Sequence, residues 1–186
     1  MKLNLGCGNF YFNDYINIDI NKKIKADYYL DLEKDRLPFE DSSCDEVYIH
    51  HVLEHLGEGY FHCIKEIYRV CKHGARVIVV FPHHFHRFYF DDPTHKRPIT
   101  WAGLAALSKT TCQYGKENGY SDTLVAFDLD VDFRMIDHIK KPDKRFLNPE
   151  TNKLIYPDNI MQEIELSQIN VIEEATVYLE VYKEET

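Results

Sequence analysis

Histidine is the residue type with the clearest chemical potential in this 186-residue sequence, because nine of its ten histidines lie between residues 50 and 95. Histidine exchanges a proton near neutral pH, and its neutral ring binds metal ions, so the cluster could supply a base or a set of metal ligands. Most of these histidines follow two apolar runs: His50, His51 and His55 come after the first, and His83, His84 and His86 come after the second. Both groups are therefore candidates for a site at the ends of two strands.

A metal site is one alternative that the histidine spacing raises. His51 and His55 are four residues apart, as in helical zinc-binding pairs, and His84 and His86 could add ligands. The glutamate of this segment is Glu54, directly before the second histidine, whereas in HExxH motifs it follows the first. We therefore expect no bound metal and a structural role for His55. A metal-dependent protein that uses the histidine cluster stays open as an alternative.

A glycine loop and an aspartate precede the histidines. Gly6 and Gly8 directly follow the apolar run that ends at Leu5, and glycine there allows a tight turn and close approach of a ligand to the backbone. Asp19 ends the next strand-like run, where a carboxylate can accept hydrogen bonds from the two hydroxyls of a ribose. The third glycine of dinucleotide motifs is missing and the acid comes early, which disfavours NAD and a phosphate cradle.

The elements that would position these residues are read from hydrophobic patterns. Short apolar runs alternate with helical segments, which predicts an α/β domain with a parallel sheet. Strands are expected at five ranges: 2–5, 15–20, 26–32, 46–52 and 76–81. Apolar residues at three- and four-residue spacing predict a helix over 61–71 with Gly74 as its C′ residue. A second helix is expected from Thr100, as its N-cap, to Leu107.

The second half of the chain has a different pattern. Apolar and polar residues alternate over 125–133 and again over 177–181, and this period of two predicts two strands with one exposed face. Such a pair fits an antiparallel edge on a parallel sheet. Residues 134–170 contain Pro142, Pro149 and Pro157 and are expected to form a long excursion with a helix around 160–166.

Five segments, taken in order, resemble the motifs of class I S-adenosylmethionine-dependent methyltransferases of the type 11 kind: LNLGCG (3–8), NIDI (17–20), LPFEDSSCDEV (37–47), HVLEHL (51–56) and EIYRVCKHG (66–74). The resemblance implies one domain over residues 1–186. It also implies a Rossmann-like, seven-stranded, mostly parallel sheet with an antiparallel C-terminal edge. The family's first helix is shortened here, since only residues 9–14 separate the glycine loop from the second strand.

The resemblance further implies that S-adenosylmethionine is the cofactor and that eight residues bind it: Gly6, Cys7, Gly8, Asp19, Ile20, Asp31, Leu32 and His50. The glycine loop would run along the methionyl part, and Asp19 would hold the ribose. Ile20, Asp31 and Leu32 would meet the adenine. His50 would sit beside the cofactor at the end of the fourth strand.

Methyl transfer needs alignment of acceptor, methyl group and sulfur, and it can use a base that takes a proton from the acceptor. We expect His84 or His95 to be that base, because both lie after the fifth strand, where an acceptor should bind. His51 is expected to be a polar neighbour of the cofactor in the catalytic site. The expected acceptor is a small molecule or a glycan, methylated at oxygen or nitrogen.

Composition limits the partners. The net charge of −9 and a single modest basic cluster over 140–145 disfavour nucleic acid, whose binding needs a basic face. The sequence contains no run of 18 uncharged apolar residues, so no membrane span is expected. Its five scattered cysteines fit reduced thiols, and we therefore expect a cytoplasmic protein. A homodimer could complete the thin cover over the site. A non-catalytic S-adenosylmethionine-binding module that acts through a partner is the other alternative.

Overall fold

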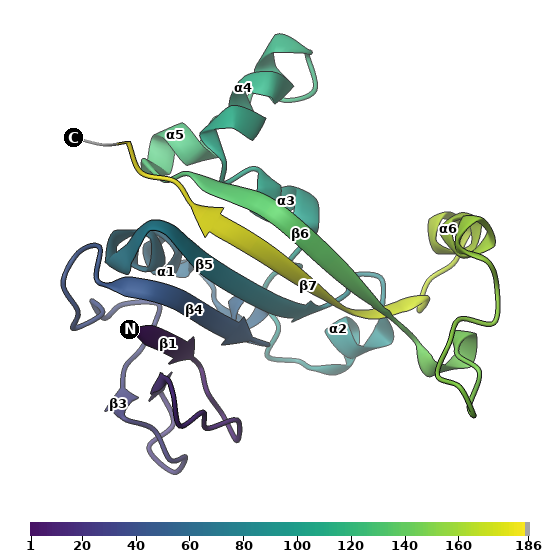
Figure 1. Cartoon of the computed structure of the whole chain (residues 1–186), viewed down its shortest axis with the longest axis horizontal. Helices are drawn as coiled ribbons and strands as arrows, with labels where there is room; N and C mark the ends of the chain where they lie inside the picture. The colour runs from purple at the N-terminus through teal and green to yellow at the C-terminus, as the bar shows by residue number, and fades with distance from the viewer. Residues whose placement is uncertain (185–186) are drawn as a thin grey trace.

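The computed structural model describes residues 1–184, whose strands form one seven-stranded sheet in the order β3-β2-β1-β4-β5-β7-β6 (Figure 1). The strands are β1 (Lys2–Leu5), β2 (Ile16–Asp19), β3 (Tyr28–Tyr29), β4 (Cys44–His50), β5 (Cys71–Pro82), β6 (Phe133–Pro142) and β7 (Ile172–Val181). β1 to β5 pair in parallel, whereas β7 runs antiparallel to both β5 and β6. The expected Rossmann-like sheet with an antiparallel C-terminal edge is confirmed.

The helices are α1 (Tyr60–Val70), α2 (Arg87–Asp91), α3 (Trp101–Ala105), α4 (Lys109–Glu117), α5 (Val125–Leu129) and α6 (Asp158–Ser167), with 3-10 turns η1 (Leu53–His55) and η2 (Lys144–Phe146). The longest helix described, α1, has 11 residues and connects β4 to β5, and α6 has 10. The expected N-cap is present at α3, where the Thr100 side chain accepts a hydrogen bond from the Gly103 N–H at 2.9 Å.

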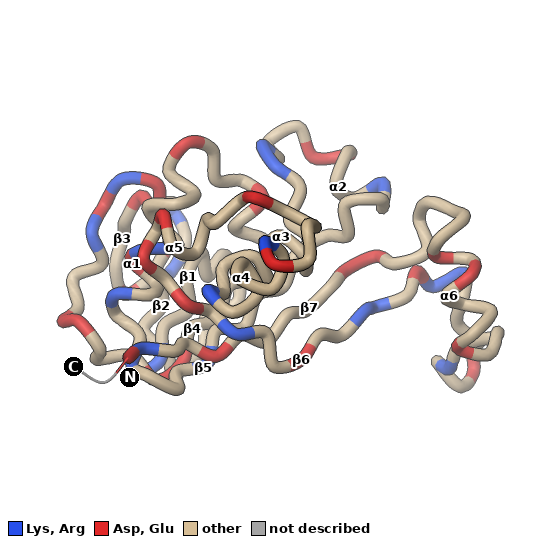
Figure 2. The backbone as a smooth tube through the Cα atoms, turned by 90° about the horizontal axis from the view of Figure 1, so that it is seen from above, with Lys and Arg blue, Asp and Glu red and all other residues tan. Residues whose placement is uncertain are grey.

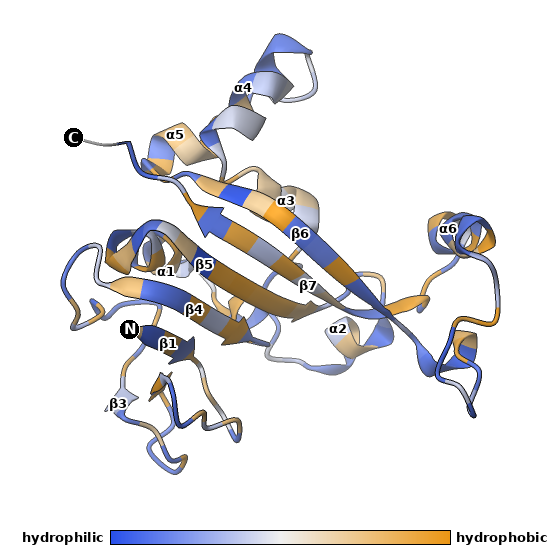
Figure 3. Cartoon of the chain, viewed as in Figure 1, coloured by the Kyte–Doolittle hydropathy of each residue, from blue (hydrophilic) through white to orange (hydrophobic). Residues whose placement is uncertain are grey.

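One face of the sheet forms the core. Val47 and Ile49 of β4 and their neighbours on β5 are buried on this face, where Ile64 and Ile67 of α1 pack against them. Figure 3 shows the apolar stretch along β5, in the middle of the sheet. Burying this apolar surface is the main stabilising contribution to the fold.

The opposite face of the sheet is only partly covered. Along β4, β5 and β7, the residues that alternate with the core positions stay half-exposed, including Tyr48, Ile78 and Tyr178. The segments that link β1 to β2 and β2 to β3 contain turns but no helix, as the described residues 6–15 and 20–27 show. The expected shortening of the first helix is thus complete, and it explains why this face lacks helical cover.

The β6–β7 ribbon carries an extension at one end of the molecule. Residues between its two strands form η2 and α6, which lie away from the other helices in Figures 1 and 2. Met161 of α6 packs with Val171 and Ile172 in a small cluster separate from the main core. The expected helix in the excursion is confirmed, although much of 134–142 belongs to β6.

Three local predictions were wrong. Residues 125–129 form α5 and not a strand, and Asp130, with φ of 53°, ends the helix before β6 begins at Phe133. Gly74 is not a helix C′ residue, because α1 ends at Val70 and the chain enters β5 at Cys71, which pairs with Cys44. The third strand, expected over 26–32, is limited to Tyr28–Tyr29, although the Asp27 and Leu30 N–H groups still donate to the Asn17 and Asp19 carbonyls of β2.

Candidate functional site

A cavity of about 510 Å³ lies at the carboxyl ends of the parallel strands. Its walls come from the residues that follow β1, β2, β3 and β4, together with Lys96 from a later loop. Open α/β sheets bind ligands at this edge, because the loops that leave neighbouring parallel strands converge there. The position of the cavity therefore follows from the topology of the sheet.

The glycine loop forms the floor of the cavity. Gly6 and Gly8 have φ values of +65° and +50°, which L-residues with a side chain rarely adopt. A Cβ atom on Gly6 would overlap Cγ2 of Val52, which also lines the cavity. Glycine is needed at position 6 both for the backbone conformation and for the close approach of the segment after β4.

Asp19 is fixed at the end of β2. Its Oδ2 accepts a hydrogen bond from the Gly8 N–H at 2.8 Å, and its Oδ1 accepts one from the Asn21 N–H at 2.8 Å. The residue is 8% exposed. Each carboxylate oxygen can accept more than one hydrogen bond, so the pair retains acceptor capacity toward the cavity that it lines.

Charged pairs surround the side of the cavity after β3. Asp31 and Lys34 form an ion pair at 2.9 Å, and the hydrogen bond from Lys34 holds the pKa of Asp31 below its usual value. Glu33 and Lys96 form another at 2.9 Å. The pKa of Glu33 is lowered first by the Gly57 N–H and then by Lys96. These side chains join the loop after β3 to the loop that contains Lys96.

His51 lies at the other end of the cavity, between two carboxylates. Its Nε2 is 2.8 Å from Oε2 of Glu174, and its Nδ1 is 3.1 Å from Oε1 of Glu54. Burial alone would lower the pKa of His51, but these two carboxylates raise it to about 9. The ring is therefore a cation at neutral pH, and it carries hydrogen on both nitrogens.

Six of the eight residues expected to bind the cofactor line the cavity: Gly6, Gly8, Asp19, Ile20, Asp31 and Leu32. The other two lie beside it. The Cys7 side chain is buried and its Sγ donates to the Lys25 carbonyl at 3.7 Å, while the His50 ring packs edge-on against Phe10 at 5.2 Å. The cofactor-binding role of each residue remains a prediction.

The two histidines expected to act as a base have different surroundings. His84 follows β5, packs against Phe85 and Trp101, and is not among the residues that line the cavity. Burial lowers the pKa of His84, which keeps its ring neutral at pH 7. His95 packs against His55, with ring centroids 4.6 Å apart, and its Nδ1 is 2.6 Å from the Tyr89 carbonyl.

Some residues of the cavity were missed in the sequence. His55, Val52 and Leu56 line it, although His55 was expected to be structural. Their position directly after β4 was a usable signal, because residues after a parallel strand face this edge of the sheet. Lys96 gave no signal, since it reaches the cavity only through the fold of its loop, where its N–H donates to the Glu54 carbonyl at 2.8 Å.

The metal ligands considered in the sequence are not brought together. Leu53–His55 is a short 3-10 turn, and His51 precedes it with φ of 52°, so His51 and His55 do not form a helical pair. His86 is fully buried against Asp143, with Nε2 and Oδ2 3.0 Å apart, and His84 packs on Trp101. The combination of these four histidines is therefore not a metal site in this fold.

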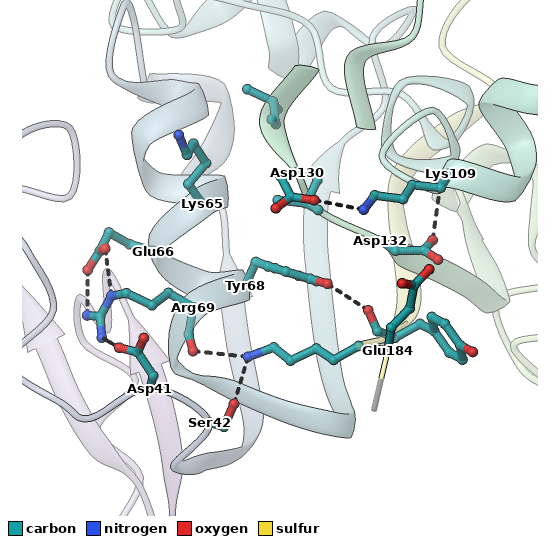
Figure 4. Close-up of a pocket in the computed structure, with 14 residues that line it drawn as sticks. Asp41, Ser42, Lys65, Glu66, Tyr68, Arg69, Lys109, Asp130, Asp132 and Glu184 are labelled. Carbon is teal, nitrogen blue, oxygen red and sulfur yellow. Dashed lines mark hydrogen bonds and ion pairs between the residues drawn. The ribbon is translucent and has the colours of Figure 1, made fainter. Parts of the chain in front are cut away.

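A second cavity, of about 630 Å³, lies between α1, the approach to β6 and the end of β7 (Figure 4). Its charged side chains largely pair with one another: Arg69 contacts Glu66 and Asp41, and Lys109 contacts Asp130. This cavity includes residues before β4 and after β7, away from the carboxyl ends of the parallel strands. It is a less suitable ligand site than the cavity above the glycine loop.

Comparisons with known proteins concern the family and the fold of this chain. Residues 3–79 match the model of the family described as methyltransferase domain, and this confirms the resemblance to class I methyltransferases. No curated protein matches the sequence significantly. The expected cofactor, S-adenosylmethionine, agrees with the matched family.

Solved structures resemble the whole chain. A SAM-dependent methyltransferase from Archaeoglobus fulgidus has a TM-score of 0.62 and 18% identity, with 96% of this chain and 85% of that chain covered. One from Methanosarcina mazei has a TM-score of 0.54 and 15% identity, with coverages of 98% and 92%. The 1,6-didemethyltoxoflavin-N1-methyltransferase of Burkholderia thailandensis, solved with S-adenosylhomocysteine, has a TM-score of 0.51 and 9% identity, with coverages of 98% and 71%. At these identities the likeness concerns the fold.

Within residues 1–184, no helix is both long and apolar enough to span a bilayer.

Proposed function

We propose that this chain transfers a methyl group from S-adenosylmethionine to a small-molecule or glycan acceptor, at an oxygen or nitrogen atom. The observation that carries the proposal is the cavity at the carboxyl ends of the parallel strands, where Asp19 is clamped by the Gly8 N–H beside two glycines with positive φ. The matched methyltransferase domain, residues 3–79, includes each residue that lines this cavity except Lys96.

In this proposal, different residues of the cavity bind different parts of the cofactor. The backbone at Gly6 and Gly8 would run along the methionyl part, and the Asp19 oxygens would accept the ribose hydroxyls. Ile20 and Leu32 would pack on the adenine, with Asp31 at its edge. The fixed geometry of Asp19 supports its part, because a carboxylate already oriented by two N–H groups loses little freedom when it binds a ligand.

When bound, S-adenosylmethionine would supply an electrophilic methyl group that passes to the acceptor as the sulfonium becomes a thioether. The chain would align the acceptor and take up its proton. We assign proton uptake to His84, whose burial-lowered pKa leaves it neutral at pH 7 and which follows β5. We do not assign it to His95, whose ring packs on His55 with ring centroids 4.6 Å apart.

His51 has a different part in this proposal. With a pKa of about 9 it is protonated at neutral pH and cannot accept a proton there. Its contacts with Glu54 and Glu174 tie the end of β4 to β7 at the cavity wall. We therefore propose that His51 shapes the catalytic site as a fixed cation beside the cofactor.

The charge distribution supports an acceptor other than nucleic acid. Figure 2 shows Lys and Arg interspersed with Asp and Glu along the described part of the chain. The residues around the cavity include the paired Glu33 and Lys96, and the net charge of the whole chain is −9. An acceptor that is neutral or carries a single charge fits these surroundings better than a polyphosphate does.

The proposal is tested by measuring S-adenosylhomocysteine formation with panels of hydroxylated and amine-bearing small molecules and of oligosaccharides. On a productive acceptor, His84→Ala should lower kcat by about 10²–10⁴-fold, as expected for loss of a general base. The matched control is His62→Ala, whose ring on α1 contacts the Asp35 carbonyl. Full turnover by His84→Ala would contradict the assignment of the base.

A non-catalytic module that acts through a partner is the second candidate. The half-exposed sheet face around Tyr48, Ile78 and Tyr178 favours it, because a partner or a second copy could supply the cover that missing helices do not. Sedimentation of the purified chain tests for a homodimer. Cofactor binding without turnover on any acceptor of these panels would support this candidate.

A further inference from the structure

Glu54, His55 and His95 form a compact group beside the cavity. Each offers one ligand atom, and these atoms lie within 4.8 Å of one another. Glu54 and His55 are neighbours in η1, and the loop that carries His95 is held over η1 by the Lys96 N–H, which donates to the Glu54 carbonyl at 2.8 Å. The group therefore comes from two segments that are about 40 residues apart and are joined by a backbone hydrogen bond.

Glu54 gives the main evidence that this group binds a ligand. Its side chain is fully buried, and neither carboxylate oxygen has a hydrogen-bond partner among residues 1–184. The cation His51 places Nδ1 3.1 Å from Oε1 as an ion pair, whereas no cation is paired with Oε2 among residues 1–184. A buried carboxylate is costly unless a cation or several donors compensate it. An ion bound among the three residues would give Oε2 the partner that it lacks.

The two histidines are oriented as metal ligands usually are. The Nδ1 of His95 is 2.6 Å from the Tyr89 carbonyl, which can only accept, so Nδ1 carries the hydrogen and Nε2 has the free lone pair. Thr94 Oγ1 donates to Asp92 Oδ1 at 2.6 Å and therefore accepts from the Nδ1 of His55, at 2.9 Å. His55 thus also presents a free lone pair on Nε2.

We propose that Glu54, His55 and His95 bind one divalent transition-metal ion, of the class of Zn²⁺. Two imidazoles and one carboxylate are a ligand set that zinc and related ions take in proteins, with further positions left for water or another ligand. His55 also lines the cavity, so the ion would adjoin the space assigned to the cofactor. This site differs from the histidine pair considered in the sequence, since it uses Glu54 and His95 and leaves His51 out.

A neighbouring group, His50, His51 and Glu174, is a weaker candidate. His51 Nε2 is hydrogen-bonded to Glu174 at 2.8 Å, and its Nδ1 faces Glu54, so both ring nitrogens hold hydrogen and neither has a free lone pair. The negative charge of Glu174 is already compensated by this contact. The two groups can be separated by experiment, because Glu174 belongs to only one of them.

The test is a titration of chelator-treated, metal-free protein with Zn²⁺ alone, in competition with a chromophoric chelator. We expect one zinc per chain. His95→Ala and Glu54→Gln should each weaken binding by at least about 10-fold, and Thr94→Val should weaken it by about 10-fold because it removes the acceptor that orients His55. His62→Ala and Glu174→Gln should bind as the wild type does.

Circular dichroism of each variant checks that it is folded, and Thr94→Val serves in place of His95→Ala if that variant does not fold. Absence of zinc binding by folded wild type, or unchanged binding in both Glu54→Gln and Thr94→Val, would overturn the proposal. Loss of binding only in Glu174→Gln would do so too. Asp19→Ala separates this site from the cofactor site, because it should lose S-adenosylhomocysteine binding and keep zinc binding.

Discussion

The close approach of Gly6 to Val52 gives a prediction whose size can be worked out from the structure. Gly6→Ala would hold an alanine at φ of +65°, and this backbone conformation costs about 1–2 kcal/mol for a residue with a side chain. The new Cβ would also overlap Cγ2 of Val52. Overpacking of this kind costs about 1–3 kcal/mol. The total loss of unfolding free energy is therefore about 2–5 kcal/mol, against about 1–2 kcal/mol for Gly8→Ala, which meets no atom within 4 Å.

Urea-induced unfolding followed by circular dichroism measures both losses. The overlap can be isolated with Val52→Ala, because the double variant Gly6→Ala/Val52→Ala should recover the overpacking part, about 1–3 kcal/mol relative to the sum of the single variants. Thermal melts should follow at about 2–4 °C per kcal/mol for a chain of this size. Equal losses for Gly6→Ala and Gly8→Ala, or strict additivity with Val52→Ala, would show that overlap with Val52 does not destabilise the Gly6→Ala variant.

Asp19→Asn should weaken S-adenosylhomocysteine binding by about 10–150-fold in calorimetry, because it removes one charged acceptor worth about 1.5–3 kcal/mol; an unchanged Kd would contradict the ribose assignment. His83 is 5% exposed, and burial lowers its pKa to about 4 in the folded chain. As the pH falls from 6.5 to 4, the unfolded chain therefore protonates this histidine before the folded chain does. Wild type should therefore lose up to about 2 kcal/mol more stability than His83→Gln between pH 7.5 and pH 5, in urea titrations at both pH values. Parallel losses in the two proteins would rule this out. Thr100→Ala should lower the free energy of unfolding by about 1 kcal/mol, because it removes the N-cap of α3. Thr100→Ser should lose much less, because its hydroxyl can still cap the helix.

The sheet could be predicted because each of its strands gives a local signal in the sequence, and these signals recur along the chain. β1, β2 and the core of β5 were found from short apolar runs, and α1 from a three- and four-residue apolar spacing that its buried residues Ile64 and Ile67 bear out. Residues 125–133 show where such signals fail. The period of two places Phe127 inside and Ala126 outside, yet Phe127 is 45% exposed and Ala126 is fully buried in α5. The tertiary packing that buries Ala126 decides so short an element. A local bond from the Val131 N–H to the Ala126 carbonyl then closes the end of the helix.

The site was predictable to the extent that it depends on strand ends. Gly6, Gly8 and Asp19 were found because each directly follows or ends a parallel strand. The group around Glu54 was not, because His95 reaches it through a loop whose position is set by hydrogen bonds to η1. Nothing in the local sequence indicates that contact. The cationic state of His51 could not be predicted from the sequence either, since it depends on Glu174 of β7, far along the chain.

Calorimetric titration of the purified chain with S-adenosylmethionine and S-adenosylhomocysteine measures whether the cavity above the glycine loop binds the cofactor. We expect one binding site per chain, with micromolar affinity that is lost in Asp19→Ala while that variant stays folded. Absence of heat from either ligand with folded wild type, or equal binding by Asp19→Ala, would contradict this expectation.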